Sequence, residues 1–308
     1  MTNKILALLD GSAYSESVCH HTAWIAGRLN ATVDVMHVMG RRESGSAQNL
    51  SGALTLGARS ALLDELTAAD ESRARLAQAK GRAILEDAQK ILEADGVGPV
   101  VPHLRKGDLL EAVQEVEPDL RAIVIGKRGE GADFAAGHLG SNLERIVRAS
   151  KVPVFVASRA FKQIGKVLVA YDGSPSAMKA IERMSKSAVF QGLQITLLYV
   201  DNGSGPIGAR MDDAVLALGA AGLSATARTV QGEPDQALEA IVASEGFDLL
   251  VMGAYGHSRI RNLIIGSTTT AMVQAVKIPS CSIADITHAN SPRPAYRAQA
   301  LRRINPEP

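Results

Sequence analysis

The sequence predicts an α/β protein in which a doubly wound, parallel, five-stranded sheet occurs twice. Short apolar runs rich in β-branched residues alternate with helical patterns along the chain. This alternation is typical of a parallel sheet that is covered by helices on both faces. Similar segments recur in the same order in the two halves, and the last apolar run of each half follows a proline. A chain of 308 residues is long enough for about two domains.

Four pairs of similar segments indicate that the chain is an internal duplication. Four matches in one order are improbable by chance, and a repeat decides how the rest of the chain is interpreted. The first two pairs are separated by 162 residues and the last two by 127 and 126. The pairs are KILALLDGS at 4–12 with KVLVAYDGS at 166–174, DVMHV at 34–38 with TLLYV at 196–200, AIVIGKRG at 122–129 with LLVMGAYG at 249–256, and 138–158 with 264–284.

In the second half, five apolar runs predict strands, and the stretches between them predict helices. The strands are VLVAY (167–171), QITLLYV (194–200), SATARTV (224–230), DLLVMG (248–253) and PSCSIA (279–284), and the helices are 176–192, a stretch around 211–222, 235–246 and 267–276.

The fall in the separation shows that the first half carries about 35 additional residues, which include 57–96. Apolar side chains near one helical face predict one long helix or two shorter ones, which end at Gly96. Charged residues fill the opposite face, so we expect a packing helix rather than a partner-binding one. The apolar positions are Leu62, Leu66, Leu76, Ala83, Ile84, Ile91 and Leu92.

The predicted last strand of each half begins at a proline, Pro153 in the first half and Pro279 in the second. Proline suits the start of an edge strand, and an exposed apolar edge invites pairing. We therefore expect the two edges to pair with each other in an intramolecular pseudo-dimer. The predicted division is a first domain at 1–160, a second at 161–285, and a tail rich in proline and arginine at 286–308.

Composition narrows the function classes. A net charge of +1 argues against nucleic acid or a membrane recognised mainly by charge. Cys19 and Cys281 are far apart, which predicts two reduced core thiols rather than a disulfide framework or a zinc site. No apolar run reaches the length of a signal peptide or a membrane span, so a cytoplasmic protein is expected.

Ligands of an open parallel sheet bind beyond the carboxyl ends of the strands, where the strand order reverses. In the second half this edge carries Asp172-Gly173-Ser174, Val200 and the stretch 253–270. Glycines in that stretch let backbone approach a ligand, and the helix start at 266–269 offers free N–H groups that suit phosphate. The alternative is that the glycines mark tight turns and that Ser267 only caps a helix.

Gly253-x-x-Gly256, nine residues and then Gly266-Ser267 resemble the ATP-binding pattern G-x2-G-x9-G-(S/T) of the universal stress protein family, here in its tandem form. The resemblance implies an adenine-nucleotide α-hydrolase-like fold and ATP as ligand, with Mg²⁺ as a bridging metal that no acidic cluster here predicts. Asp172 and the Val200 backbone would contact adenine and ribose, and the glycines would lie along the phosphates. The implied positions are Ala170, Tyr171, Asp172, Gly173, Val200, Met252, Gly253, Gly256, Arg259, Gly266, Ser267, Thr268 and Thr269, with weaker ones at Asp10, Val38, Gly126, Gly129, Gly140 and Ser141.

The first half departs from this pattern. Ten residues, not nine, separate Gly129 from Gly140, and Glu130 and Asp133 bring carboxylates toward the expected triphosphate. Such carboxylates repel phosphate, although Lys127 and Arg128 offset part of the repulsion. We expect nucleotide mainly in the second half, and Asp10 is then only a turn-capping residue.

The sequence leaves three functions open. The first is a stress-response regulator that binds ATP without rapid turnover and alters its affinity for a protein partner. The second is a slow ATPase or phosphotransferase that uses the same pocket, and the third is a nucleotide-free scaffold acting as a dimer. No Ser/His/Asp or Cys/His grouping and no candidate general base is evident, which favours the first. A phosphate-binding G-x-x-x-x-G-K-(S/T) loop is missing from the sequence, and this argues against a P-loop NTPase.

Overall fold

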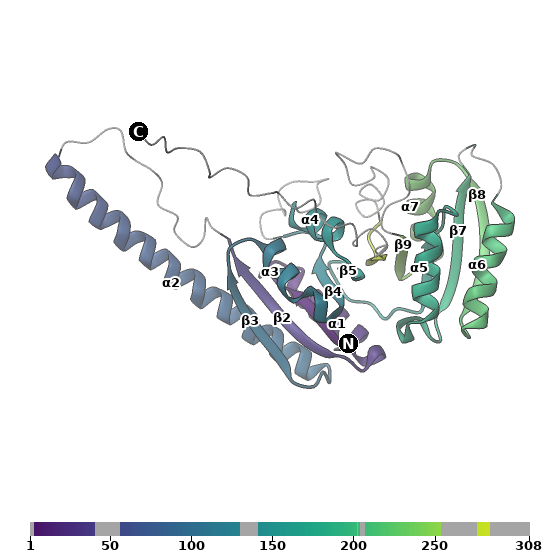
Figure 1. Ribbon diagram of the computed structural model, residues 1–308, viewed down its shortest axis with the longest axis horizontal. Helices are drawn as coiled ribbons and strands as arrows, with labels where there is room; N and C mark the ends of the chain where they lie inside the picture. Colours follow the sequence, from purple (N-terminus) through teal and green to yellow (C-terminus); the bar gives the residue numbers. More distant parts are fainter. Residues whose placement is uncertain are drawn as a thin grey trace, which may run out of the picture.

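The computed structural model describes residues 3–40, 56–129, 141–201, 203, 207–253 and 276–283. Within these residues the chain repeats one alternation of strands and helices (Figure 1). The first half contains β1 (Lys4–Leu8), α1 (Ser15–Leu29), β2 (Thr32–Met39), α2 (Leu56–Ala94), β3 (Val100–Lys106), α3 (Leu109–Val116), the 3₁₀-helix η1 (Glu117–Asp119), β4 (Leu120–Gly126), α4 (Ser141–Ala149) and β5 (Val154–Ala157).

The second half repeats this order on the other side of the molecule. It contains β6 (Lys166–Ala170), α5 (Pro175–Ser185), the 3₁₀-helix η2 (Ala188–Phe190), β7 (Gln194–Asp201), α6 (Gly208–Ala220), β8 (Ser224–Gln231), α7 (Pro234–Glu245), β9 (Leu249–Gly253) and β10 (Ser280–Ile283).

The strands form one ten-stranded sheet in the order β3-β2-β1-β4-β5-β10-β9-β6-β7-β8. Neighbouring strands are parallel within each half, whereas β5 and β10 pair antiparallel, with Cys281 opposite Phe155. This confirms two parallel five-stranded sheets whose edges pair in an intramolecular pseudo-dimer. The strand order reverses between β1 and β4, and again between β6 and β9, so each half has one switch point at its carboxyl edge.

Each face of the sheet has its own apolar core. Residues of α1, α2, α5 and α6 cover one face, and residues of α3, α4 and α7 cover the other. Both cysteines are free and buried, and burial raises the pKa of each thiol to about 12. A thiol with such a pKa stays protonated at neutral pH and is a poor nucleophile, as expected of core residues.

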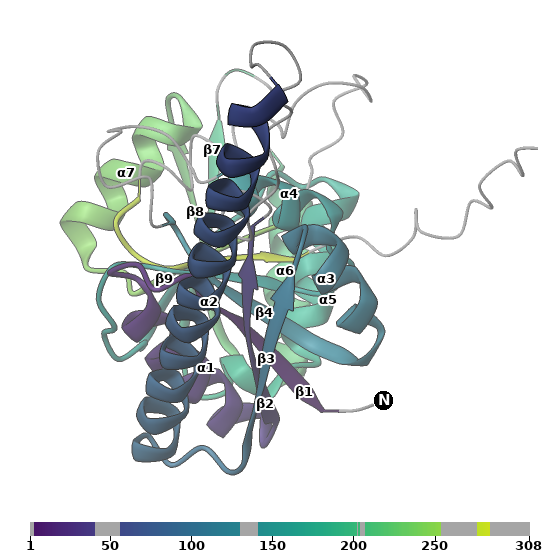
Figure 2. The ribbon, with the colours of Figure 1, turned by 90° about the vertical axis from the view of Figure 1, so that its left-hand side faces the viewer.

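The additional segment of the first half contains a single helix, α2, of 39 residues. Its C-terminal part packs beside α1, β2 and β3, and its N-terminal part continues beyond the sheet (Figure 1, Figure 2). Its buried apolar side chains, among those that the structure describes, include Leu85, Ala88 and Leu92. The predicted face was wrong at Leu76 and Ala83, which are exposed, because Leu76 lies on the part of the helix that has no sheet beneath it.

One helix of the second half is shorter than predicted. The pattern over 176–192 predicts a single helix, but α5 ends at Ser185 and η2 follows after two residues. The hydroxyl of Ser187 accepts a hydrogen bond from the N–H of Val189 at 3.4 Å and so begins the new turn, as serine does at helix starts. The predicted helix at 267–276 lies outside the described residues, apart from Val276.

Candidate functional site

Four strand-end positions named by the sequence meet at the carboxyl edge of the second half. Ala170 of β6 lies between Leu198 of β7 and Met252 of β9 in the register of the sheet. Val200 lies one residue from the end of β7, and Gly253 ends β9 beside Ile283. The edge therefore combines β6, β7 and β9 at the switch point, where parallel sheets bind ligands.

The turn after β6 is built by Asp172. The N–H of Ser174 donates to Asp172 Oδ1 at 2.9 Å, and Gly173 adopts a positive φ of 69°. The hydroxyl of Ser174 then accepts from the N–H of Ala177 at 3.1 Å and caps α5. This arrangement turns the chain sharply at the edge and leaves the Asp172 side chain exposed.

The same turn follows β1. The N–H of Ser12 donates to Asp10 Oδ1 at 3.0 Å, and Gly11 has a φ of 77°. Asp10 is thus a turn-capping residue, as expected from its position in the sequence. Since Asp172 caps its turn in the same way, this role alone does not distinguish the two halves.

The predicted residues of the edge differ in what they expose. Ala170 and Val200 are half-buried, whereas Tyr171 and Met252 are 2% and 3% exposed. The Tyr171 hydroxyl donates to the carbonyl of Arg210 at 3.1 Å, and Met252 belongs to the core. Tyr171 and Met252 therefore offer backbone rather than side chains at this edge, and the exposed groups are the Asp172 carboxylate and the apolar surfaces of Ala170 and Val200.

Arg210 is a residue at this edge that the sequence did not reveal. It lies in the first turn of α6, and its guanidinium donates to the carbonyl of Gly173 at 3.2 Å. The contact spans 37 residues of sequence, and no spacing rule relates the two positions. Arg210 places a positive charge directly beside the Asp172 turn.

Packing at the end of β9 requires a glycine at position 253. A Cβ at this position would lie 3.0 Å from the carbonyl oxygen of Ser176 and 3.1 Å from the N–H nitrogen of Ala177. The end of β9 thus fits tightly against the first turn of α5, whose backbone cannot move aside easily. A Cβ on Gly126, at the corresponding place in the first half, would lie 2.9 Å from Tyr14 Cβ.

The remaining motif positions fall outside the described residues. These are Gly140, Gly256, Arg259, Gly266, Ser267, Thr268 and Thr269, whereas Ser141 is the first residue of α4.

The first half has a polar cavity of about 490 Å³ at its corresponding edge. Val38, which matches Val200, lines it together with Asp108, Glu111 and Arg145. Asp108 caps α3 and pairs with Arg145 at 2.8 Å, and this hydrogen bond lowers the pKa of the Asp108 carboxyl. Two carboxylates therefore face this cavity, and its arginine is already paired with one of them.

Comparisons with known proteins agree with the architecture. The family model of the universal stress protein family matches residues 1–158 and 207–280. The chain belongs to the universal stress protein family. The universal stress protein Slr1230 of Synechocystis is 34% identical over 279 residues, covering 89% of this chain and 97% of that protein. A universal stress protein from Archaeoglobus fulgidus, with a TM-score of 0.64 at 20% identity, covers 92% of this chain and 96% of its own and shares the fold.

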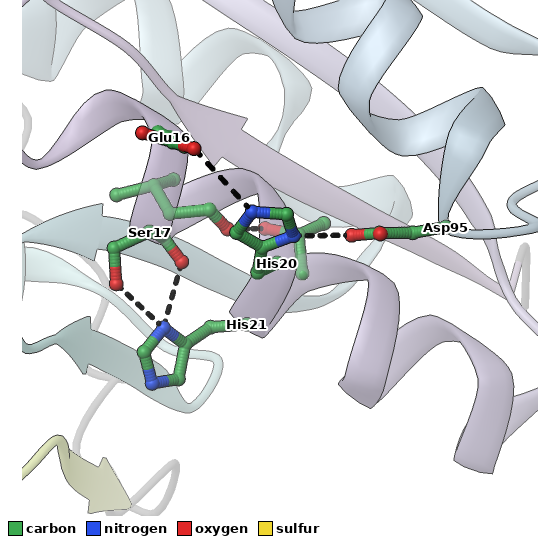
Figure 3. Close-up of polar contacts among 7 residues, drawn as sticks. Glu16, Ser17, His20, His21 and Asp95 are labelled. Carbon is green, nitrogen blue, oxygen red and sulfur yellow. Dashed lines mark hydrogen bonds and ion pairs between the residues drawn. The ribbon is translucent and has the colours of Figure 1, made fainter. Parts of the chain in front are cut away.

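This universal stress protein carries a buried histidine next to a half-buried one on α1 (Figure 3). His21 Nδ1 lies 2.7 Å from the carbonyl oxygen of Ser17. His20 points the other way, with Nδ1 2.6 Å from Asp95 after α2. The two rings therefore point apart, toward different partners.

Neither a metal-binding cluster nor a membrane-spanning helix occurs among the described residues of this universal stress protein. No cluster of three or more His, Cys, Asp or Glu residues there could hold a metal ion. None of the helices described there combines the length and the apolar character needed to cross a membrane.

Proposed function

We propose that this chain is a stress-response regulatory protein that binds ATP without rapid turnover, mainly at the carboxyl edge of its second half. The observation that supports it most is the meeting of the Asp172 turn, Val200 and Gly253 at one switch point. The glycine motif of the family begins at Gly253 in the sequence. The edge that suits a nucleoside is therefore connected to the segment that suits phosphates.

The described residues fit the nucleoside part of ATP. Ala170 and Val200 offer apolar surface for adenine, and the exposed Asp172 carboxylate can accept hydrogen bonds from ribose hydroxyls. Arg210 lies beside the Asp172 turn and adds a positive charge toward the ligand. Bound Mg²⁺ would supply charge neutralisation at the phosphates, and this proposal assigns no protein ligand to it.

The charges of the two corresponding loops support a preference for the second half. Glu130 and Asp133 are in the first-half loop, at positions where the second half has His257 and Ile260. Additional carboxylates near a triphosphate raise the free energy of binding.

Isothermal titration calorimetry with ATP tests the proposal. Gly266→Val in the second-half motif should weaken ATP binding by at least about tenfold, because shifted backbone donors lose hydrogen bonds to charged oxygens. Gly140→Val is the matched control in the first half, and it should leave the affinity nearly unchanged. Nucleotide that co-purifies with the protein should amount to about one per chain.

Three results would contradict this proposal. Normal ATP binding by Gly266→Val would show that the second-half site is wrongly assigned. Equal losses of ATP affinity in the two variants would show that neither half is preferred. Steady phosphate release that Gly266→Val abolishes and Gly140→Val retains would replace the regulator with an ATPase. Gly253→Val is unsuitable for this test, because its side chain would collide with the backbone of α5.

A further inference from the structure

A second cavity, of about 340 Å³, lies at the seam where the two halves join. It opens between the C-terminal part of α1, η2 and the central strands β5 and β10. Its walls are mostly apolar, and its volume lies within the range of small-molecule sites. The apolar lining includes Ile25, Phe155, Val189, Phe190, Cys281 and Ile283.

The matching place at the other end of the seam is filled by the segment that joins the two halves. The Phe161 ring packs against His21, with centroids 5.0 Å apart, and His21 in turn packs against Phe155 at 5.4 Å. The next residue, Lys162, forms an ion pair with Asp248 at 3.1 Å. The joining segment thus fills this place with an apolar side chain, that of Phe161, and a positively charged one, that of Lys162.

The internal repeat shows which cavity residues correspond to the residues around Phe161. His21 corresponds to Arg183 at the separation of 162 residues, and Phe155 corresponds to Cys281 at 126. Arg183 and Cys281 both line the cavity. The cavity is therefore the counterpart of the place that Phe161 occupies.

At one position the charge at the mouth of the cavity is opposite to that of its counterpart. Asp248, which receives Lys162, corresponds to Arg121 at the separation of 127 residues. Arg121 lines the cavity together with Lys151, and both are exposed at its mouth. A ligand that binds in the cavity as the joining segment binds at the other end needs an apolar part and a negatively charged group.

We propose that the seam cavity binds an amphipathic carboxylate, with its apolar chain over Phe155 and Cys281 and its carboxylate beside Arg121 and Lys151. Lys186 also lines the cavity, but it is paired with Glu182 at 2.5 Å. The segment that follows β10, 284–308, has four arginines and two acidic residues. We do not expect it to occupy the cavity, because its positive charge would be repelled by Arg121 and Lys151. At roughly 30 Å³ for a water-sized group, the volume suits a chain of about ten carbons.

Titration with decanoate below its micelle concentration tests this site, with calorimetry and the fluorescence of the single Trp24 as readouts. Trp24 is half-buried on α1 next to Ile25, which lines the cavity. Decanoate should bind at one per chain and change the fluorescence. Affinity should rise roughly three- to fourfold per added methylene from hexanoate to decanoate, as buried apolar area grows.

A charge-removing variant separates this site from unspecific adsorption. Arg121→Gln with Lys151→Gln should weaken decanoate by roughly tenfold and leave the neutral decanol unchanged. Lys277→Gln is the matched control, because Lys277 is exposed and corresponds to Lys151 at the other end of the seam. All variants carry exposed substitutions and should keep the melting temperature.

The proposal is overturned by several results. One is decanoate binding that does not saturate at one per chain. Others are equal affinities for decanoate and decanol, or an effect of Lys277→Gln as large as that of the double variant.

Discussion

His21 is a single side chain whose burial has a consequence for stability. Its ring is 0% exposed, and burial lowers its pKa from 6.5 to about 4. The hydrogen bond to the Ser17 carbonyl acts in the opposite direction, and the neighbouring His20 lowers the pKa further. The folded protein therefore keeps this ring neutral at a pH where the unfolded chain already binds a proton.

Stability should accordingly fall as the pH drops from 6.5 toward 4, since the unfolded state takes up the proton first. Between pH 7.5 and pH 5 the loss from His21 is about 2 kcal/mol. In urea unfolding, His21→Asn should reduce the difference between these two pH values by that amount. Asparagine keeps an N–H donor near the position of Nδ1.

His20→Asn is the control for this prediction, because His20 is half-buried and pairs with Asp95. It should retain the loss of stability in acid that depends on His21. An unchanged pH difference in His21→Asn would show that other groups cause the acid sensitivity.

Residues that follow local rules could be predicted, and residues fixed by long-range contacts could not. The Asp-Gly-Ser turns were visible because their spacing is local, and both form as Asx turns. Arg210 became apparent only through its contact with Gly173 in the folded chain. The packing role of Gly253 was likewise hidden, because it depends on how β9 meets α5.

At the level of elements, α2 combines a packed half and a protruding half. Leu92 is fully buried, whereas Leu76 is 72% exposed. Leu92→Ala should lower the free energy of unfolding by about 2–4 kcal/mol, since it removes buried methyl groups and leaves a cavity. Leu76→Ala should change it by less than about 0.5 kcal/mol.

Urea unfolding of the two leucine variants checks this contrast. Equal losses would mean that the protruding part of α2 is covered in solution, for instance by a second copy of the chain. The size of the oligomer, measured by light scattering, would then identify that cover.

Periodicity predicted that α2 exists and roughly where it ends, because an apolar stripe repeats along it. It could not separate the part above the sheet from the part beyond it, since Leu76 and Leu92 look alike in sequence. The central strands, such as β6 and β9, were easier to predict, because their apolar runs are short and continuous. The division of η2 from α5 depended on one serine hydroxyl and did not appear in the pattern.

On the scale of the whole molecule, the contacts at the seam couple the stability of the two halves. β5 and β10 close each other's edges, so neither half ends in an unpaired central strand. Arg28 of α1 adds a hydrogen bond from Nε to the carbonyl of Val189 at 2.6 Å. The ammonium of Lys127 donates to the carbonyl of Val276, and burial lowers its pKa to about 8.

This shared sheet predicts one cooperative unfolding transition for both halves, although tandem domains often unfold separately. Trp24 fluorescence reports on the first half, and far-ultraviolet circular dichroism reports on the whole chain, so the two curves in urea should coincide. Phe155→Ala should shift both curves together to a lower urea concentration, because Phe155 is buried at the seam. The free energy of unfolding should fall by about 3 kcal/mol. Leu216→Ala, at a 70% exposed position on α6, should move neither. A Trp24 transition that precedes the loss of half of the helical signal would show that the halves unfold independently and that the seam contributes little to their stability.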